Sequence, residues 1–149
     1  MPPVTMTPQS ECPRCQLNTV DGGEVFYHRK RTFKFDVDLA LQIVSDGREP
    51  VEVDDESLRK TLRKTEVCEE HLPHVHLGRP GILAHVTYHL EDGRTVIAHV
   101  LIDGNHRAAR SLRDGIPFRV YLLNEEETAR TLLRAPEKIA VPRRSLARR

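Results

Sequence analysis

The fold is decided by one stretch of the sequence, Val100-Leu101-Ile102-Asp103-Gly104-Asn105-His106-Arg107-Ala108-Ala109-Arg110-Ser111-Leu112-Arg113-Asp114-Gly115. The apolar run that leads into it, from Val96 to Ile102, predicts a buried strand in the centre of a sheet. Asp103-Gly104-Asn105 predicts a turn, because glycine allows a positive φ and Asp and Asn tolerate one. A helix follows, with Asn105 or Asp103 expected as its N-cap, and ends at Gly115.

This arrangement of strand, turn and helix favours an anion. A helix that begins directly after a buried strand presents its first backbone N–H groups, together with the positive end of its dipole, to a ligand. Gly104 would let a phosphate approach the backbone, and the guanidinium groups of Arg107 and Arg110 could bind its oxygens. His106 could donate one more hydrogen bond. The same residues also allow a plain strand–turn–helix unit whose arginines are solvated.

Two segments beyond the turn complete a recognisable pattern. Phe118 to Leu123 predicts a strand that follows a Pro-containing loop, and Glu125-Glu126-Glu127 predicts the acidic start of a helix. From about Pro80 to Leu133 the chain therefore resembles the ParB/sulfiredoxin superfamily, in which a Gly-x-x-Arg turn binds phosphate. The resemblance implies an α+β fold with a small mixed sheet flanked by helices. It also implies a nucleotide-phosphate site made by Gly104, Asn105, His106, Arg107 and Arg110.

Within that superfamily the turn binds CTP in ParB, ATP in sulfiredoxin and ADP in the free-serine kinases. Asp103-Gly104-Asn105-His106-Arg107 is most similar to the Asp-Gly-His-x-Arg turn of the serine kinases. The resemblance makes Asp103 and His106 candidate catalytic residues, with Asp103 holding Mg²⁺ or acting as a base in phosphoryl transfer or nucleotide hydrolysis. Sulfinic-acid reduction is not expected, because sulfiredoxin needs a nucleophilic cysteine where this chain has Asn105.

Composition restricts the function further. The 149 residues suit one domain with a real core, and a net charge of +1 argues against non-specific nucleic-acid binding by the whole molecule. No segment approaches the length of a membrane span and the N-terminus lacks the features of a signal peptide, so we expect a cytoplasmic protein without a membrane partner.

The cysteines and one histidine suggest a zinc site. Cys12 and Cys15 form a Cys-x-x-Cys knuckle, and Cys68 and His71 form a Cys-x-x-His pair of similar reach. Together they predict one structural Zn²⁺, since four protein ligands leave no open coordination position. His74 or His76 could replace His71. The alternative is a pair of free thiols near the N-terminus and a buried Cys68.

The remaining pattern divides the chain into three parts. We expect an N-terminal extension with the knuckle (1–30), a ParB/sulfiredoxin-like core (31–134) and a basic tail (135–149). Helices are predicted after Asp36, after Asp54 or Asp55, and from Asn124 through Leu133. Arg79 is a second candidate for phosphate contact. The main alternative function is a non-enzymatic DNA-associated module that uses the basic tail, and another is an interaction domain without a ligand.

Overall fold

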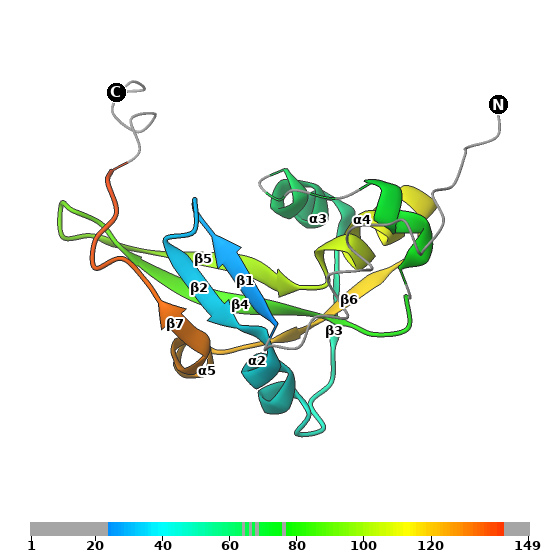
Figure 1. Ribbon diagram of the computed structural model, residues 1–149, viewed down its shortest axis with the longest axis horizontal. Helices are drawn as coiled ribbons and strands as arrows, with labels where there is room; N and C mark the ends of the chain where they lie inside the picture. Colours follow the sequence, from blue (N-terminus) through cyan, green and yellow to red (C-terminus); the bar gives the residue numbers. More distant parts are fainter. Residues whose placement is uncertain (1–23, 64, 66, 68, 76, 142–149) are drawn as a thin grey trace.

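The computed structural model describes residues 24–141, except 64, 66, 68 and 76, and for residues 69–71 it describes the backbone only. Over these residues the chain has an α+β fold with two sheets (Figure 1). One sheet has the order β1-β2-β7, namely Val25–His28, Phe33–Asp36 and Leu132–Arg134. The other has the order β3-β6-β4-β5, namely Val51–Val53, Phe118–Leu122, Gly81–His89 and Thr95–Asp103.

The four-stranded sheet is mixed, as the sequence predicts. Its β3–β6 and β4–β5 pairs are antiparallel, whereas β4 and β6 are parallel. The prediction that Thr95 to Asp103 forms the central strand is wrong, because β6 pairs with β4 and leaves β5 at the end of the sheet order. The start of the strand is accordingly exposed at Val96 and Ile97, and only Val100 to Asp103 is buried.

The described helices are α2 (Val37–Val44), α3 (Asp55–Leu62), α4 (Asn105–Asp114), α5 (Glu125–Thr131) and the short 3₁₀ helix η2 (Glu69–His74). Of these, α2, α3 and α5 begin directly after polar residues that the sequence indicates. Asp36 and Asp54 cap α2 and α3 by accepting hydrogen bonds from backbone N–H groups of their first turns, at 3.0 Å and 2.7 Å. None of the helices in the described ranges is both long and apolar enough to cross a membrane.

The last helix is shorter than expected. Asn124 and Glu127 form the predicted capping box at the start of α5, with bonds of 2.7 Å and 3.0 Å. The helix then stops at Thr131, and Leu132 opens β7 by pairing with Phe35 of β2. The prediction of a helix through Leu133 is therefore wrong, since pairing with β2 ends the helix where no glycine or proline does.

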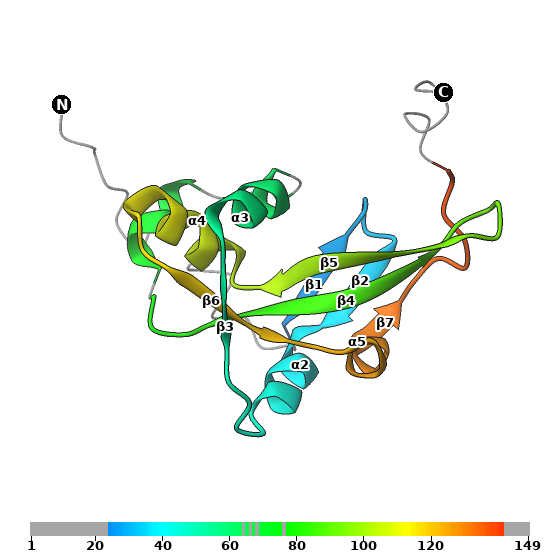
Figure 2. The ribbon, with the colours of Figure 1, turned by 180° about the vertical axis from the view of Figure 1, so that it is seen from behind.

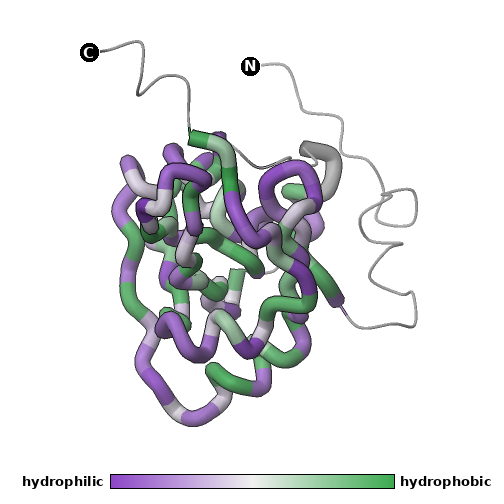
Figure 3. The backbone as a smooth tube through the Cα atoms, turned by 90° about the vertical axis from the view of Figure 1, so that its left-hand side faces the viewer, coloured by the Kyte–Doolittle hydropathy of each residue, from purple (hydrophilic) through white to green (hydrophobic). Residues whose placement is uncertain are grey.

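The two sheets face each other across the main hydrophobic core. Figures 1 and 2 show β1 and β2 lying across β4 and β5, with α2 and α5 on one side and α3 and α4 at the opposite end. Phe33 and Phe35 of β2 pack with Ile82 of β4 and Ile102 of β5 in this core. Figure 3 shows hydrophobic stretches of the backbone interspersed with hydrophilic ones.

A second core lies on the other face of the four-stranded sheet and supports α4. It contains Leu58 of α3, Leu101 of β5, Ala108 of α4 and Phe118 of β6. Leu101 thus faces this core, whereas its neighbours Val100 and Ile102 face the main one. Burial on both faces explains why Val100, Leu101 and Ile102 are all apolar.

The ends of the chain differ from the expected division. The boundary expected at residue 30 falls inside the β1–β2 turn, because the hairpin runs from Val25 to Asp36. Ile139, in the segment expected to be a tail, exchanges backbone hydrogen bonds with His89 and Glu91 at the β4–β5 hairpin, at 2.8 Å and 3.0 Å. The predicted zinc ligands Cys12, Cys15 and Cys68 lie outside the described residues, as does the side chain of His71.

Candidate functional site

The turn between β5 and α4 is built on Gly104. Gly104 has φ +93° and is the N-cap of α4, without a side-chain capping bond, so the prediction that Asn105 or Asp103 caps the helix is wrong. The first hydrogen bond of α4 runs from Ala108 N–H to Gly104 O at 2.8 Å, and the amides before it point out of the helix end. Gly115 closes the helix with φ +69°, as predicted.

Gly104 is required by close packing within the chain. A Cβ at this position would lie 2.9 Å from the Cα of Gly81 and 3.1 Å from Nη2 of Arg107. A Cβ at Gly81 would in turn lie 2.7 Å from the carbonyl oxygen of Asp103. The two glycines allow the start of β4 to contact the turn. This contact explains why position 104 is a glycine, and sequence spacing does not reveal it.

Asp103 holds two guanidinium groups beside the turn. Its side chain is buried, and its Oδ2 accepts a hydrogen bond from Arg107 Nη2 at 3.1 Å. Arg79 Nη2 lies 3.7 Å from the same oxygen, and its side chain is 55% exposed. Arg107 Nη2 also donates to the carbonyl oxygen of Pro80 at 3.2 Å. Two cations against one carboxylate leave an excess of positive charge next to the start of α4.

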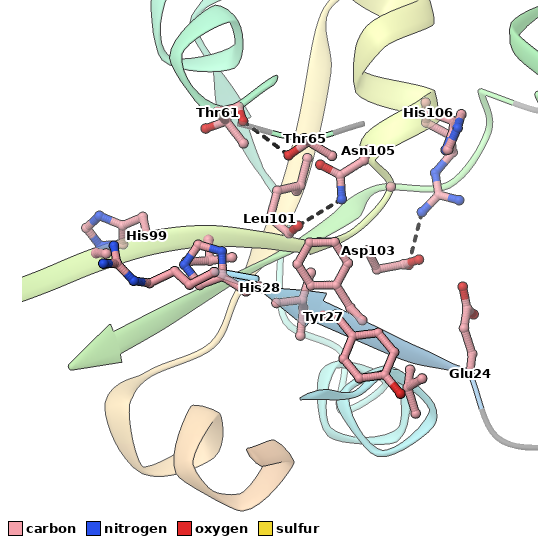
Figure 4. A pocket seen from close by; sticks show the side chains of 18 of the residues that line it. Glu24, Tyr27, His28, Thr61, Thr65, His99, Leu101, Asp103, Asn105 and His106 are labelled. Atoms are coloured by element: carbon pink, nitrogen blue, oxygen red, sulfur yellow. Dashed lines mark hydrogen bonds and ion pairs between the residues drawn. The ribbon is translucent and has the colours of Figure 1, made fainter. Parts of the chain in front are cut away.

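Asn105 carries a buried oxygen whose hydrogen-bonding capacity is unused. Its side chain is 7% exposed, and its amide nitrogen donates to the carbonyl oxygen of Leu101 at 2.9 Å (Figure 4). Within the described part of the chain, Asn105 Oδ1 and Arg107 Nε are buried side-chain atoms without a hydrogen-bond partner. An unpaired acceptor and an unpaired donor thus lie on one helix turn, and buried groups of this kind are normally satisfied.

The other predicted phosphate ligands are placed differently. His106 lies on the first turn of α4 and lines the same pocket as Asp103 and Asn105 (Figure 4). Arg110, one turn further on, donates to the carbonyl oxygen of Val75 and lies 3.5 Å from Asp114. The structure therefore brings Asp103, Asn105, His106 and Arg107 together and directs Arg110 to Val75, just after η2, and to the end of its own helix.

These residues form one side of a groove with a volume of 1490 Å³. The groove extends along the end of β5 to strand β1 and the β1–β2 turn, and Figure 4 shows Tyr27 and His28 on that side. The described residues that line it include two carboxylates, Glu24 and Asp103, and six cationic side chains, Arg29, Lys30, Arg31, Lys60, Arg79 and Arg107. The groove is therefore strongly basic, although the whole chain carries a net charge of only +1.

The basic β1–β2 turn is the part of the groove that sequence reasoning missed. Arg29, Lys30 and Arg31 all have positive φ, between +51° and +67°. The guanidinium carbon of Arg29 lies 5.1 Å from the ring centre of Tyr88, and that of Arg31 lies 4.9 Å from the ring centre of Tyr27. The run of three cations between two strands was the available signal, but only the fold shows that it lines the same groove as the start of α4.

Metal binding has no support in the described part of the chain. No group of three or more His, Cys, Asp or Glu side chains there is arranged to hold a metal ion. The predicted zinc site needs residues outside that part, so it stays a prediction.

Comparisons with known proteins identify no family for this chain. No family model matches the chain, and neither a curated protein nor a solved structure matches it significantly.

Proposed function

We propose that this protein binds a nucleotide, with a phosphate group at the N-terminal end of α4 between Arg79 and Arg107. The single observation that carries the proposal is the Arg107 guanidinium on the first turn of this helix, which lines the groove beside Asp103 and Arg79 and whose Nε has no hydrogen-bond partner among the described residues. A phosphate oxygen would take up the unused hydrogen-bonding capacity of the Arg107 guanidinium once this side chain turns toward the groove.

The surrounding charge supports an anionic ligand. Arg79 is largely exposed and linked to Asp103 at 3.7 Å, so it can move from the carboxylate to a phosphate with little desolvation cost. The amides and dipole of α4 add to the attraction, because the helix N-terminus carries a partial positive charge. The proposal includes the resemblance to the ParB/sulfiredoxin superfamily, in which the corresponding turn binds nucleotide phosphates.

In this proposal Asp103 is a positioning residue. It accepts a hydrogen bond from Arg107 and lies beside Arg79, and this arrangement aligns both guanidinium groups for a phosphate. Phosphoryl transfer or hydrolysis would require the carboxylate to exchange one of these partners for Mg²⁺ or a hydroxyl group. Nucleotide binding needs no such exchange and is the function that the observed geometry supports best.

Isothermal titration calorimetry with ATP, ADP, CTP and GTP, with and without Mg²⁺, tests this proposal. Loss of one charge-assisted contact in Arg107→Ala is expected to cost ~1.5–3 kcal/mol, which weakens binding roughly ten- to a hundredfold. Arg107→Lys keeps the charge but loses the planar fork, and should bind at an intermediate level.

Arg113→Ala is the matched control, because Arg113 lies on the same helix, is half exposed and does not line the groove. It should bind like the wild type. Circular dichroism should show that all three variants are folded. No binding of any nucleotide by the folded wild-type protein, or equal binding by the wild type and Arg107→Ala, would contradict the proposal.

A further inference from the structure

We infer that the groove binds a single strand of nucleic acid, and that the phosphate site at α4 holds one of several successive phosphates. This inference rests on the proposed function, because it takes the α4 site as one end of the bound strand. The observations that carry it are the size of the groove, the spread of its positive charges and the tyrosine that lines it.

The groove is larger than one nucleotide requires. Pockets for small molecules and cofactors usually enclose roughly 300–1,000 Å³. The groove between β1, β5 and α4 has a volume of 1490 Å³. A mononucleotide bound at α4 would therefore leave the part next to the β1–β2 turn open for further units of a chain.

The positive charges follow the length of the groove. Arg79 and Arg107 lie at the α4 end, whereas Arg29, Lys30 and Arg31 lie in the β1–β2 turn at the other side. Asp103 is already matched by Arg107 and Arg79. A polyanion with regularly spaced charges fits this distribution, since the two groups of cations lie on different elements along one groove.

The β1–β2 turn is held in a costly backbone conformation. Three consecutive non-glycine residues with positive φ are unfavourable for L-amino acids. Arg134 supports the turn by donating to the carbonyl oxygen of Arg31 at 2.7 Å. Outliers of this kind gather at functional sites, where surrounding contacts maintain them. Here the conformation presents three cations at the edge of the groove.

An exposed aromatic side chain favours nucleic acid over other polyanions. Tyr27 of β1 lines the groove, is 36% exposed and stacks with the guanidinium of Arg31, 4.9 Å from its ring centre. Proteins bind single strands by combining a basic groove with aromatic side chains on which bases stack. An acidic peptide would satisfy the charges, whereas a nucleic acid strand would in addition place a planar base beside the stacked Tyr27 and Arg31.

Fluorescence anisotropy with labelled oligothymidylates of increasing length tests the inference on the full chain. Affinity should rise from the dinucleotide to longer oligomers. The triple variant Arg29→Gln/Lys30→Gln/Arg31→Gln should bind a long oligomer at least ~10-fold more weakly, and its salt slope should fall by about 2, because each lost phosphate contact removes ~0.7. Its mononucleotide affinity should be unchanged. Gln can adopt the turn as readily as Arg, so the fold should persist.

The control is Arg94→Gln/Arg113→Gln/Arg119→Gln, which removes the same charge outside the groove. Equal losses in the two triple variants, or equally tight binding of duplex DNA or polyglutamate, would overturn the inference. Mononucleotide binding without tighter oligomer binding would also overturn it and would leave the proposed function intact. Oligomer binding that is unaffected by Arg107→Ala would instead contradict the α4 phosphate site.

Discussion

Arg48 is the residue whose removal tests the energetics of the fold most clearly. Its guanidinium group lies between the end of α2, the end of β6 and the start of α5. It donates to Glu127 Oε1 at 3.0 Å, to Glu127 Oε2 at 2.6 Å and to the carbonyl oxygen of Leu122 at 2.8 Å. It also donates to Asp46 at 2.9 Å and 2.8 Å. One side chain thus joins β6, α5 and the loop after α2 through a fork that lysine cannot reproduce.

The expected cost of Arg48→Ala follows from burial. The side chains of Arg48 and Glu127 are 22% and 18% exposed, so their paired hydrogen bonds are partly shielded from water. Loss of hydrogen bonds to a charged group, with the carboxylate left behind, costs about 2–3 kcal/mol of unfolding free energy. Asp46 is exposed and adds little.

The loss of unfolding free energy in Arg48→Ala should become smaller as the pH falls. Hydrogen bonds from Arg48 lower the pKa of Glu127 below its ordinary 4.5, and lower the pKa of Asp46 from 3.8 to about 2. A carboxylate whose pKa is lowered by folding stabilises the fold above its ordinary pKa, and this stabilisation is lost as the pH falls through the lowered value. The difference between wild type and Arg48→Ala should therefore be constant near neutrality and shrink between about pH 4.5 and 2.

Urea denaturation followed by circular dichroism at several pH values measures this difference. Arg94→Ala is the control, because Arg94 pairs with Asp92 at 2.6 Å on the exposed β4–β5 hairpin. Exposed pairs contribute at most about 1 kcal/mol. The reasoning would be refuted if both variants lost the same free energy at pH 7, or if the loss in Arg48→Ala did not change with pH.

Three further predictions concern the turn, a cap and the metal. Gly104→Ala should destabilise the protein more than Gly115→Ala in thermal unfolding, because both glycines have positive φ but only Gly104 touches Gly81. Gly115→Ala should cost ~1–2 kcal/mol. Equal costs of the two substitutions would contradict the packing argument. Asn124→Ala should lose ~1 kcal/mol in urea denaturation by removing the capping box, and an unchanged midpoint would count against it. Elemental analysis should find one zinc per chain that Cys12→Ser removes, and a metal-free wild type would disprove the zinc site.

Local features of the fold could be predicted from the sequence. Asp36, Asp54 and Asn124 cap helices because each acts on a backbone amide two or three residues away. The turn at Gly104 and the stop at Gly115 follow in the same way from the backbone freedom of glycine. These signals need no knowledge of the tertiary structure.

Features that depend on distant contacts could not be predicted. The approach of Gly81 to Gly104, and of Arg79 to Asp103, depends on how β4 and β5 align. The apolar run of β5 indicated a central strand, because central strands are usually buried on both faces. An edge strand that is covered on both faces has the same apolar sequence, so the two positions cannot be distinguished. Leu132 is in a strand and not in the preceding helix because it pairs with Phe35 of β2. Local propensity carries no information about such a distant pairing.

The central claim is that an anionic group binds at the first turn of α4, and amide chemical shifts test it most directly. Proton–nitrogen correlation spectra of the labelled protein should be recorded as the best-binding nucleotide is added to wild type and Arg107→Ala. The account predicts that the largest shifts fall on Gly104, Asn105, His106 and Arg107, and that they shrink strongly in the variant. Saturating nucleotide that leaves these four amides unshifted, or moves them equally in Arg107→Ala, would contradict it.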